Sequence, residues 1–299
     1  MTVTADPPGA RTARVAQSGR SRLLPWLGLV PFLVFSGAFL LIPTFKLILG
    51  SLQDSDGNFT LSNYEDFSSK IVFNAYQTSI EISLVTAIAA AVFGFLLAYA
   101  VISGGLPKPI RAAVMTFSGV ASNFAGIPLA LAFIFTIGRQ GLLTVLLKGI
   151  GVDPYANGFN LYSKIGLEIV YFYFQLPLMV LVIAPAIDGL KRDWREASEN
   201  LGASSFQFWR YIALPILMPS LLGSTMLLFG NAFGAQATAA QLTGGLLNLV
   251  PLLIGDQLSG DVLHTPGKGF AYAVGMIVIM AVALAGYALL QRRAERWRR

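Results

Sequence analysis

Few side chains in this chain could do chemistry, and most of them are amides and carboxylates rather than nucleophiles. There is no cysteine and a single histidine, His264, so no thiol catalysis, disulfide framework or histidine-rich metal site is expected. The patterns G-x-x-x-x-G-K-[ST], H-E-x-x-H and G-x-S-x-G do not occur, and Gly267-Lys268-Gly269 is only a fragment of a phosphate-binding loop. We therefore predict no catalytic residue, no metal site and no cofactor in this chain.

The most charged internal segment runs from Asp188 to Arg210, between two apolar stretches. Arg192 and Glu196 are four residues apart, a spacing that stabilises a helix by a few tenths of a kcal/mol. We predict a short helix over residues 193–203 that ends or bends at Gly202. From these residues alone, two readings stay open: a loop lying on lipid headgroups, with its aromatic residues at the interface, or a docking surface for another protein.

Polar side chains are rare inside the apolar stretches, and such residues are candidates for function. Asn123 stands near Gly126 and Pro128, and Asn231 and Gln236 flank a glycine-containing stretch. We predict that Asn123, Asn231 and Gln236 line a solute pathway. The alternative is that they make hydrogen bonds between helices.

The composition shows which elements must hold these residues. The chain is 55% hydrophobic and 12% charged, against about 25% charged residues in a soluble domain. Apolar stretches long enough to span a bilayer recur along it. The predicted spans are 26–50, 77–102, 112–137, 166–187, 213–236 and 269–290. The predicted fold is therefore all-α: a polytopic membrane protein with six transmembrane helices.

The basic residues predict the orientation of these spans, because Lys and Arg are retained on the cytoplasmic side. Most lie in the N-terminal arm, the second and fourth loops and the C-terminal tail. The alternate segments hold only Lys70, Arg139, Lys148, Lys164 and Lys268. Both termini are therefore predicted to be cytoplasmic. We attribute the net charge of +6 to basic residues kept on the cytoplasmic side of the membrane, and we expect no nucleic-acid partner.

The predicted organisation has three parts. Residues 1–22 form a disordered basic cytoplasmic arm, residues 23–291 a six-helix transmembrane domain containing the loop 188–215, and residues 292–299 a basic cytoplasmic tail. We expect no soluble domain.

The charged loop carries a pattern that resembles a known family. Glu196-Ala197-Ser198 is followed by Gly202, then by nine residues, then by Ile212-Ala213-Leu214-Pro215. This is similar to the signature loop, E-A-A then G then I-x-L-P, of permease subunits of binding-protein-dependent ABC importers (MetI-like fold, type I). Ser198 departs from the pattern, and it is small like the alanine it replaces.

The resemblance implies partners and roles. The loop of such permeases docks on an ATPase subunit dimer, which binds ATP and Mg. A second homologous permease subunit completes the pathway, as a heterodimer or a homodimer, and an extracytoplasmic solute-binding protein delivers the solute. Glu196 is then the polar anchor, Ala197 permits close approach and Gly202 allows the turn. Ser198, Ile212, Leu214 and Pro215 complete the coupling loop. The implied location is the inner membrane of a bacterial cell, in contact with lipid.

The layout around the loop resembles the spermidine/putrescine-type permeases most. The implied solute is small and polar, such as a polyamine. However, residues 229–236 lack the carboxylate that polyamine-type relatives often carry, and a polycation needs compensating charge in a low-dielectric pathway. A phosphonate, a sugar, an amino-acid-like solute or a metal complex therefore stays open as an alternative.

Two other classes of function are alternatives to the importer subunit. A stand-alone secondary transporter should carry a carboxylate or histidine at mid-membrane, and none stands centrally in the predicted spans. A channel belongs to the same class. A membrane scaffold predicts no ATPase partner at all.

Overall fold

A computed structural model describes residues 24–259 and 265–296. In this part of the chain all regular secondary structure is helical, apart from an isolated bridge between Gln53 and Phe59. Six helical segments there are long and apolar enough to cross a membrane, which confirms the predicted number of spans. The predicted arm, residues 297–299 of the predicted tail and His264 lie outside the described residues, and the rest of the predicted tail continues helix α13 to Arg296.

The first helices belong to a separate compact unit, Met1–Leu49. Helix α1 (Leu24–Ser36) continues through a π-helical turn, η2 (Gly37–Leu41), into α2 (Ile42–Ser51). The wide turn comes just before Pro43 in the sequence. Proline has no N–H for an i→i−4 bond, and its ring crowds the carbonyl four residues earlier, so a π turn accommodates it without ending the helix.

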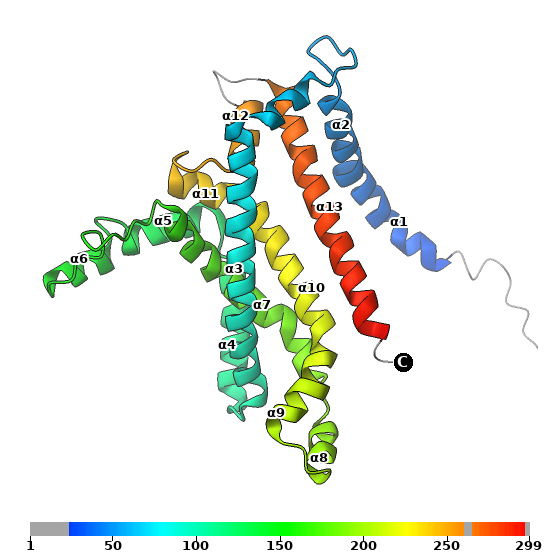
Figure 1. Ribbon diagram of the computed structural model, residues 1–299, viewed down its shortest axis with the longest axis vertical. Coiled ribbons are helices and arrows are strands. Elements are labelled where there is room, and N and C mark those ends of the chain that lie inside the picture. The colour runs from blue at the N-terminus through cyan, green and yellow to red at the C-terminus, as the bar shows by residue number, and fades with distance from the viewer. Residues whose placement is uncertain (1–23, 260–264, 297–299) are drawn as a thin grey trace, which may run out of the picture. The chain divides into compact units, whose positions relative to one another are not determined.

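The centre of the second unit, Gly50–Arg299, is a close pair of long helices. Helix α3 (Lys70–Ser103) packs against α7 (Lys164–Asp188), and α10 (Leu214–Phe233) packs against both (Figure 1). A Cβ atom on Gly94 would stand only 2.7 Å from the Met179 Cβ. A small residue at this position therefore lets α3 and α7 approach closely.

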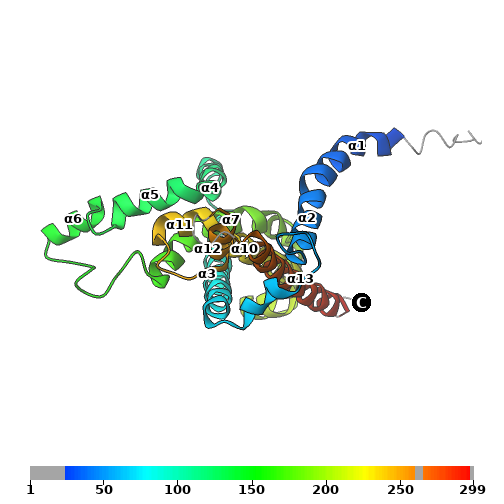
Figure 2. The ribbon, with the colours of Figure 1, turned by 90° about the horizontal axis from the view of Figure 1, so that it is seen from above.

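The prediction of one continuous third helix over residues 112–137 is wrong. The chain forms α4 (Lys108–Ser122), which packs against α7, then breaks, and continues as α5 (Gly126–Ile137) and α6 (Leu142–Gly149). Helices α5 and α6 extend away from the α3–α7 pair (Figures 1 and 2). The physical reason is local: Gly126 has a φ of +71°, and Pro128 disfavours helical backbone in the residue before it.

The fifth span also differs from the prediction of 213–236. It begins earlier, with α9 (Ser205–Phe208) and a π-helical turn, η4 (Trp209–Ala213), that leads into α10. It ends at Phe233, and after Gly234 and Ala235 a new helix, α11 (Gln236–Thr243), begins. Gln236 is therefore not in the fifth helix, because the backbone turns at Gly234-Ala235.

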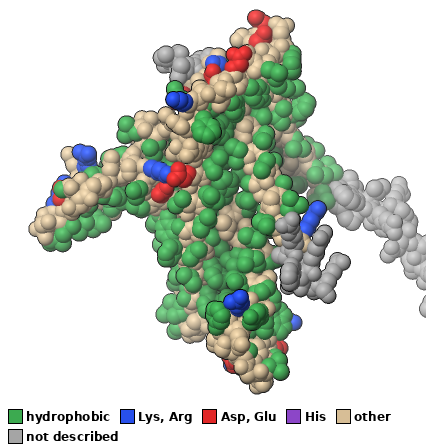
Figure 3. All heavy atoms as spheres, viewed as in Figure 1, with side chains coloured by type: hydrophobic (Ala, Val, Ile, Leu, Met, Phe, Trp, Pro, Cys, Tyr) green, Lys and Arg blue, Asp and Glu red, His purple; other side chains and the backbone are tan. Residues whose placement is uncertain are grey.

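The remaining elements lie at the two ends of the unit. The short helix α8 (Arg192–Asn200) follows α7, whereas the 3-10 helix η3 (Ser62–Ser68), α12 (Val250–Ser259) and α13 (Pro266–Arg296) meet at the opposite end. There Lys268 Nζ lies 2.6 Å from Asp66 Oδ2, and the Tyr76 hydroxyl donates to the Tyr272 carbonyl at 2.6 Å. Apolar side chains cover most of the face seen in Figure 3, and the charged ones stand in a few small groups.

Candidate functional site

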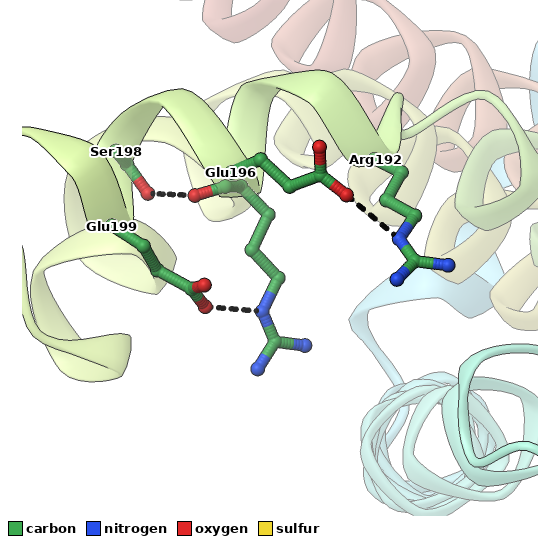
Figure 4. A network of polar contacts seen from close by, with 5 residues as sticks. Arg192, Glu196, Ser198 and Glu199 are labelled. Carbon is green, nitrogen blue, oxygen red and sulfur yellow. Dashed lines mark hydrogen bonds and ion pairs between the residues drawn. The ribbon is translucent and has the colours of Figure 1, made fainter.

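Helix α8 has the charged surface that the sequence predicted. Arg192 Nε donates to Glu196 Oε1 at 2.9 Å, and Arg195 Nε donates to Glu199 Oε1 at 3.0 Å. The two pairs run along the helix in Figure 4. All four side chains are more than half exposed, so each pair adds little stability and stays open to a partner.

Gly202 ends α8 as predicted, with a φ of +79° that favours glycine. The Ala203 N–H donates to the Ser198 carbonyl at 3.0 Å, and the Gly202 N–H donates to the Glu199 carbonyl at 2.9 Å. These two bonds form a Schellman motif. The next helix, α9, starts at once with a reciprocal capping box between Ser204 and Gln207. The turn between α8 and α9 is thus fixed by its own local bonds.

Neighbouring residues of the signature lie on opposite faces of α8. Ala197 is exposed. Ser198 is only 5% exposed, and its hydroxyl donates to the Arg195 carbonyl at 2.8 Å. Ala197 and Glu196 are therefore accessible to a partner, whereas Ser198 faces inward. A small residue at 198 serves packing within this chain.

The second half of the signature, Ile212-Ala213-Leu214-Pro215, lies close to the turn at Gly202. Ile212 and Gly202 line one groove of about 300 Å³ beneath the α8–α9 turn. Leu214 and Pro215 open α10, and the Leu214 N–H donates to the Trp209 carbonyl across the wide π turn. The π turn again precedes a proline, so η4 accommodates Pro215 as η2 accommodates Pro43.

Aromatic contacts join this segment to the long helix α3. The Trp209 ring packs edge-on against Tyr99, with centroids 4.8 Å apart, and contacts Phe95 at 6.2 Å. A hollow of about 630 Å³ lies between α8 and the ends of α3 and α7, and Glu196 and Trp209 both line it. We call residues 192–215 the coupling segment, after the role that the sequence resemblance implies.

Three large apolar side chains of the coupling segment face outward; two belong to the loop's aromatic residues, and Leu201 was not predicted. Leu201 is 88% exposed, Phe206 70% and Tyr211 68%. Exposed apolar residues beside a charged helix are typical of a protein–protein interface. Their position within an otherwise polar loop is the feature of the sequence that indicates their exposure.

The three predicted pathway residues lie at or near the two breaks described above. Asn123 follows the end of α4, Gln236 is the first residue of α11, and Asn231 stands in the last turn of α10. All three are exposed. The Asn123 side chain donates to the Gly119 carbonyl of its own helix at 2.9 Å. We call the two non-helical segments, residues 123–125 and 234–235, the paired break.

Two hydroxyl side chains join the elements around the paired break. The Gly126 N–H donates to Thr238 Oγ1 at 2.9 Å. The same hydroxyl donates to the Gly126 carbonyl oxygen at 3.3 Å. The Tyr171 hydroxyl donates to the Ala235 carbonyl at 2.6 Å. Thr238 and Tyr171 were not predicted, because their partners lie far away in the sequence. Non-helical backbone at membrane depth is tolerated only where it is buried in protein or lines a watery cavity.

Comparisons with known proteins agree with this architecture. The family model described as "Binding-protein-dependent transport system inner membrane component" matches residues 21–296. A spermidine/putrescine transport system permease protein, PotB, of Haemophilus influenzae is 27% identical over 86% of this chain and 92% of its own. A probable sulfate transport system permease protein, cysT, of Prototheca wickerhamii is 28% identical over 72% of this chain and 80% of its own.

A solved structure has the same fold. A chain of a bacterial ABC transporter involved in the import of the acidic polysaccharide alginate superposes with a TM-score of 0.71. It is 17% identical, and the match covers 92% of this chain and 96% of that one. The family match spans nearly the whole chain, and the fold and the six apolar helices agree with it. The chain belongs to the binding-protein-dependent transport system inner membrane components and is a permease subunit of an ABC importer.

Proposed function

We propose that the coupling segment docks on an ATPase subunit and passes its movement to the membrane helices. The observation that carries this proposal is the build of the segment: an exposed charged helix, a turn fixed by local bonds, and an aromatic anchor from Trp209 to α3. Such a unit moves as one piece. A force on α8 is therefore delivered to α3 and α10 rather than absorbed by a flexible loop.

In this proposal Glu196, Ala197 and Gly202 lie at the ATPase contact, with Leu201 beside them. Ile212, Leu214 and Pro215 form the junction with α10. Hydrolysis of ATP, with its Mg, takes place in the partner ATPase dimer, and this chain is a non-catalytic transport subunit.

Co-purification tests the docking surface directly. The importer is solubilised from membranes with a tag on this chain, and the ATPase subunit retained with it is quantified. Wild-type protein should retain the ATPase, and Glu196→Lys should lose it while still inserting into the membrane. Normal retention in the variant would contradict the docking assignment.

We also propose that both termini and the coupling segment are cytoplasmic, in the inner membrane of a bacterial cell. The alternation of basic and weakly basic segments supports this orientation. A reporter fused after Arg299 should report a cytoplasmic location. A periplasmic signal would overturn the orientation.

We propose that Asn123, Asn231 and Gln236 line the solute pathway at the paired break. Their exposure and their position beside non-helical backbone support this role. A second homologous permease subunit, in a heterodimer or a homodimer, supplies the other half of the pathway. An extracytoplasmic binding protein delivers the solute.

The proposed solute is small and polar, and the relatives suggest two kinds. One is a polyamine, as the name of the Haemophilus influenzae permease indicates, and the other is sulfate, as the names of the cysT relatives indicate. The three pathway candidates are amides, which leave a polycation without compensating charge. An amide can donate to an oxyanion or accept from an ammonium group, so these residues fit either kind of solute.

Uptake into membrane vesicles that contain the complete importer separates the two kinds of solute. Labelled sulfate and labelled spermidine serve as probes, each with the other as unlabelled competitor. ATP-dependent uptake of sulfate would identify the solute as an oxyanion. ATP-dependent uptake of spermidine would identify it as a polyamine.

A further inference from the structure

The paired break leaves backbone groups without partners in their own helices. The Gly126 N–H stands at the start of α5, where a helix has no acceptor for its first donors. The Ala235 carbonyl lies between α10 and α11. Inside a membrane such groups are costly unless the protein satisfies them.

One side chain from another helix satisfies each of these groups. Thr238 contacts both the N–H and the carbonyl of Gly126, and Tyr171 donates to Ala235. The two side chains are 2% and 3% exposed. Helix α11 is thereby held to α5, and the segment 234–235 that precedes it is held to α7.

We propose that Thr238 and Tyr171 are positioning residues for transport. Their hydroxyls hold the two halves of the paired break in register and keep water out of the contact between α5 and α11. This inference rests on the proposed pathway, since it fixes the places of Asn123 and Gln236 on it. Both residues act through the backbone and do not themselves contact the solute.

Other buried hydroxyls of the same unit behave differently. Thr243, also on α11 and also 2% exposed, donates to the Ala239 carbonyl of its own helix at 2.9 Å. Ser224, which is also buried, likewise donates to the Ser220 carbonyl four residues earlier in α10. Bonding to its own helix is thus the common arrangement here, and Thr238 departs from it to reach a residue 112 positions away. Thr243→Val is therefore a matched control for Thr238→Val.

A buried alanine behind the contact can report its opening. Ala130, on α5, and Ala239, on α11, are both 0% exposed and belong to the same apolar cluster. Water reaches Ala130 when α5 separates from α11. The chain has no cysteine, so Ala130→Cys introduces a single thiol. Ala87→Cys, in the 0% exposed core between α3, α7 and α10, is the control reporter.

The experiment measures the labelling rate of each thiol in the assembled importer, in membrane vesicles, with a membrane-impermeant cationic methanethiosulfonate reagent. Labelling of a buried thiol follows the population of the open state. Removing one membrane-buried hydrogen bond should raise that population about threefold. Thr238→Val and Tyr171→Phe should therefore speed labelling of Ala130→Cys about threefold and leave Ala87→Cys unchanged. Thr238→Ser keeps the hydroxyl and should restore the slow rate.

Equal labelling rates of Ala130→Cys in Thr238→Val and Thr243→Val would overturn the proposal. Faster labelling at both reporters would also overturn it, because that pattern means general loosening of the fold. So would a fast rate in Thr238→Ser. If Thr238→Val does not insert into the membrane, Tyr171→Phe and Thr238→Ser still decide the question.

The outcome is separable from the docking proposal. ATP hydrolysis by the assembled importer, measured in the same vesicles, depends on the coupling segment. Normal hydrolysis in Glu196→Lys would sink the docking assignment and leave the labelling result intact. Normal labelling in Thr238→Val would sink the positioning role and leave the docking assignment intact.

Discussion

The coupling segment and the paired break are held together by bonds of opposite range. In the coupling segment the ion pairs of α8, the Gly202 turn and the capping box all join residues at most five positions apart. At the paired break the deciding bonds join residues 112 and 64 positions apart. The first region is shaped by local sequence, and the second by the packing of distant helices.

The two regions also differ in exposure, and this suggests a division of labour. The charged side chains of α8 are more than half exposed, while Thr238 and Tyr171 are nearly inaccessible. An exposed, locally rigid surface suits a partner that binds and releases. A buried, long-range contact suits a part of the pathway that must keep its shape. Changes in the first should break coupling without disturbing the fold, and changes in the second should loosen the contact between α5 and α11 while the ATPase stays bound.

The largest expected effect breaks the coupling segment at its turn. Gly202→Asp places a side chain at a φ of +79°, which costs about 1–2 kcal/mol, and adds a charge to the docking surface. We expect loss of both uptake and ATPase co-purification. The matched control is Gly57→Asp, because Gly57 has a φ of +82° and open space around it, in a loop at the other end of the unit. Equal loss of ATPase retention in both variants would show that strain, not docking, is responsible.

Reversing the charge at Glu196 should have the next largest effect. Glu196→Lys replaces the Arg192 ion pair by repulsion and removes the proposed polar anchor. ATP hydrolysis coupled to uptake should fall about tenfold or more, which corresponds to roughly 1.4 kcal/mol or more of lost contact. Glu65→Lys, in η3 at the opposite end, is the control. A similar fall in ATP hydrolysis in that control would contradict the role of Glu196 as the polar anchor.

A smaller effect is expected from Thr238→Val on transport itself. Misplaced pathway residues should raise the apparent KM for uptake about threefold, while the retained ATPase stays at the wild-type level. Uptake is measured against concentration of whichever of sulfate and spermidine the vesicles accumulate. Thr243→Val should keep the wild-type KM. An unchanged KM in Thr238→Val would limit its role to packing.

Gln175 tests whether a buried polar side chain between two helices contributes to stability. Its side chain is 0% exposed and donates to Thr86 at 2.8 Å, and its Oε1 has no hydrogen-bond partner in the described part of the chain. Gln175→Leu loses one interhelical bond but also removes an unsatisfied oxygen, so the stability change should stay under about 1 kcal/mol. The thermal unfolding midpoint of the solubilised protein measures it. A large drop would mean that the bond from Gln175 to Thr86 contributes more than an interhelical hydrogen bond usually does.

The smallest effect should come from the exposed ion pair. The Arg192 side chain is 89% exposed, and such a pair is worth about 0.3–0.5 kcal/mol. Arg192→Ala should leave the unfolding midpoint nearly unchanged. Ser198→Leu, at a buried position of the same helix, should lower it clearly. If the two variants are alike, α8 is less firmly packed than its contacts indicate.

Several features could be predicted because their causes are local. The apolar segments set the number of spans, the charge spacing set helix α8, and Gly202 set its end. The third span could have been predicted better, since Gly126 and Pro128 stand at the break and both disfavour a continuous helix. The prediction failed there because it was based on the length of the apolar stretch and did not take account of these two residues.

The sequence by itself determined the class of the protein, the number of its helical spans and the local structure of residues 192–215, since each rests on composition or on residues a few positions apart. The tertiary structure alone decided that Ser198 faces inward, that the breaks after α4 and α10 are joined through α11, and that Thr238 and Tyr171 join them. The physical reason is the range of the bonds. A hydroxyl can choose a carbonyl in its own helix or a distant backbone group, and only the packing of the helices decides between them.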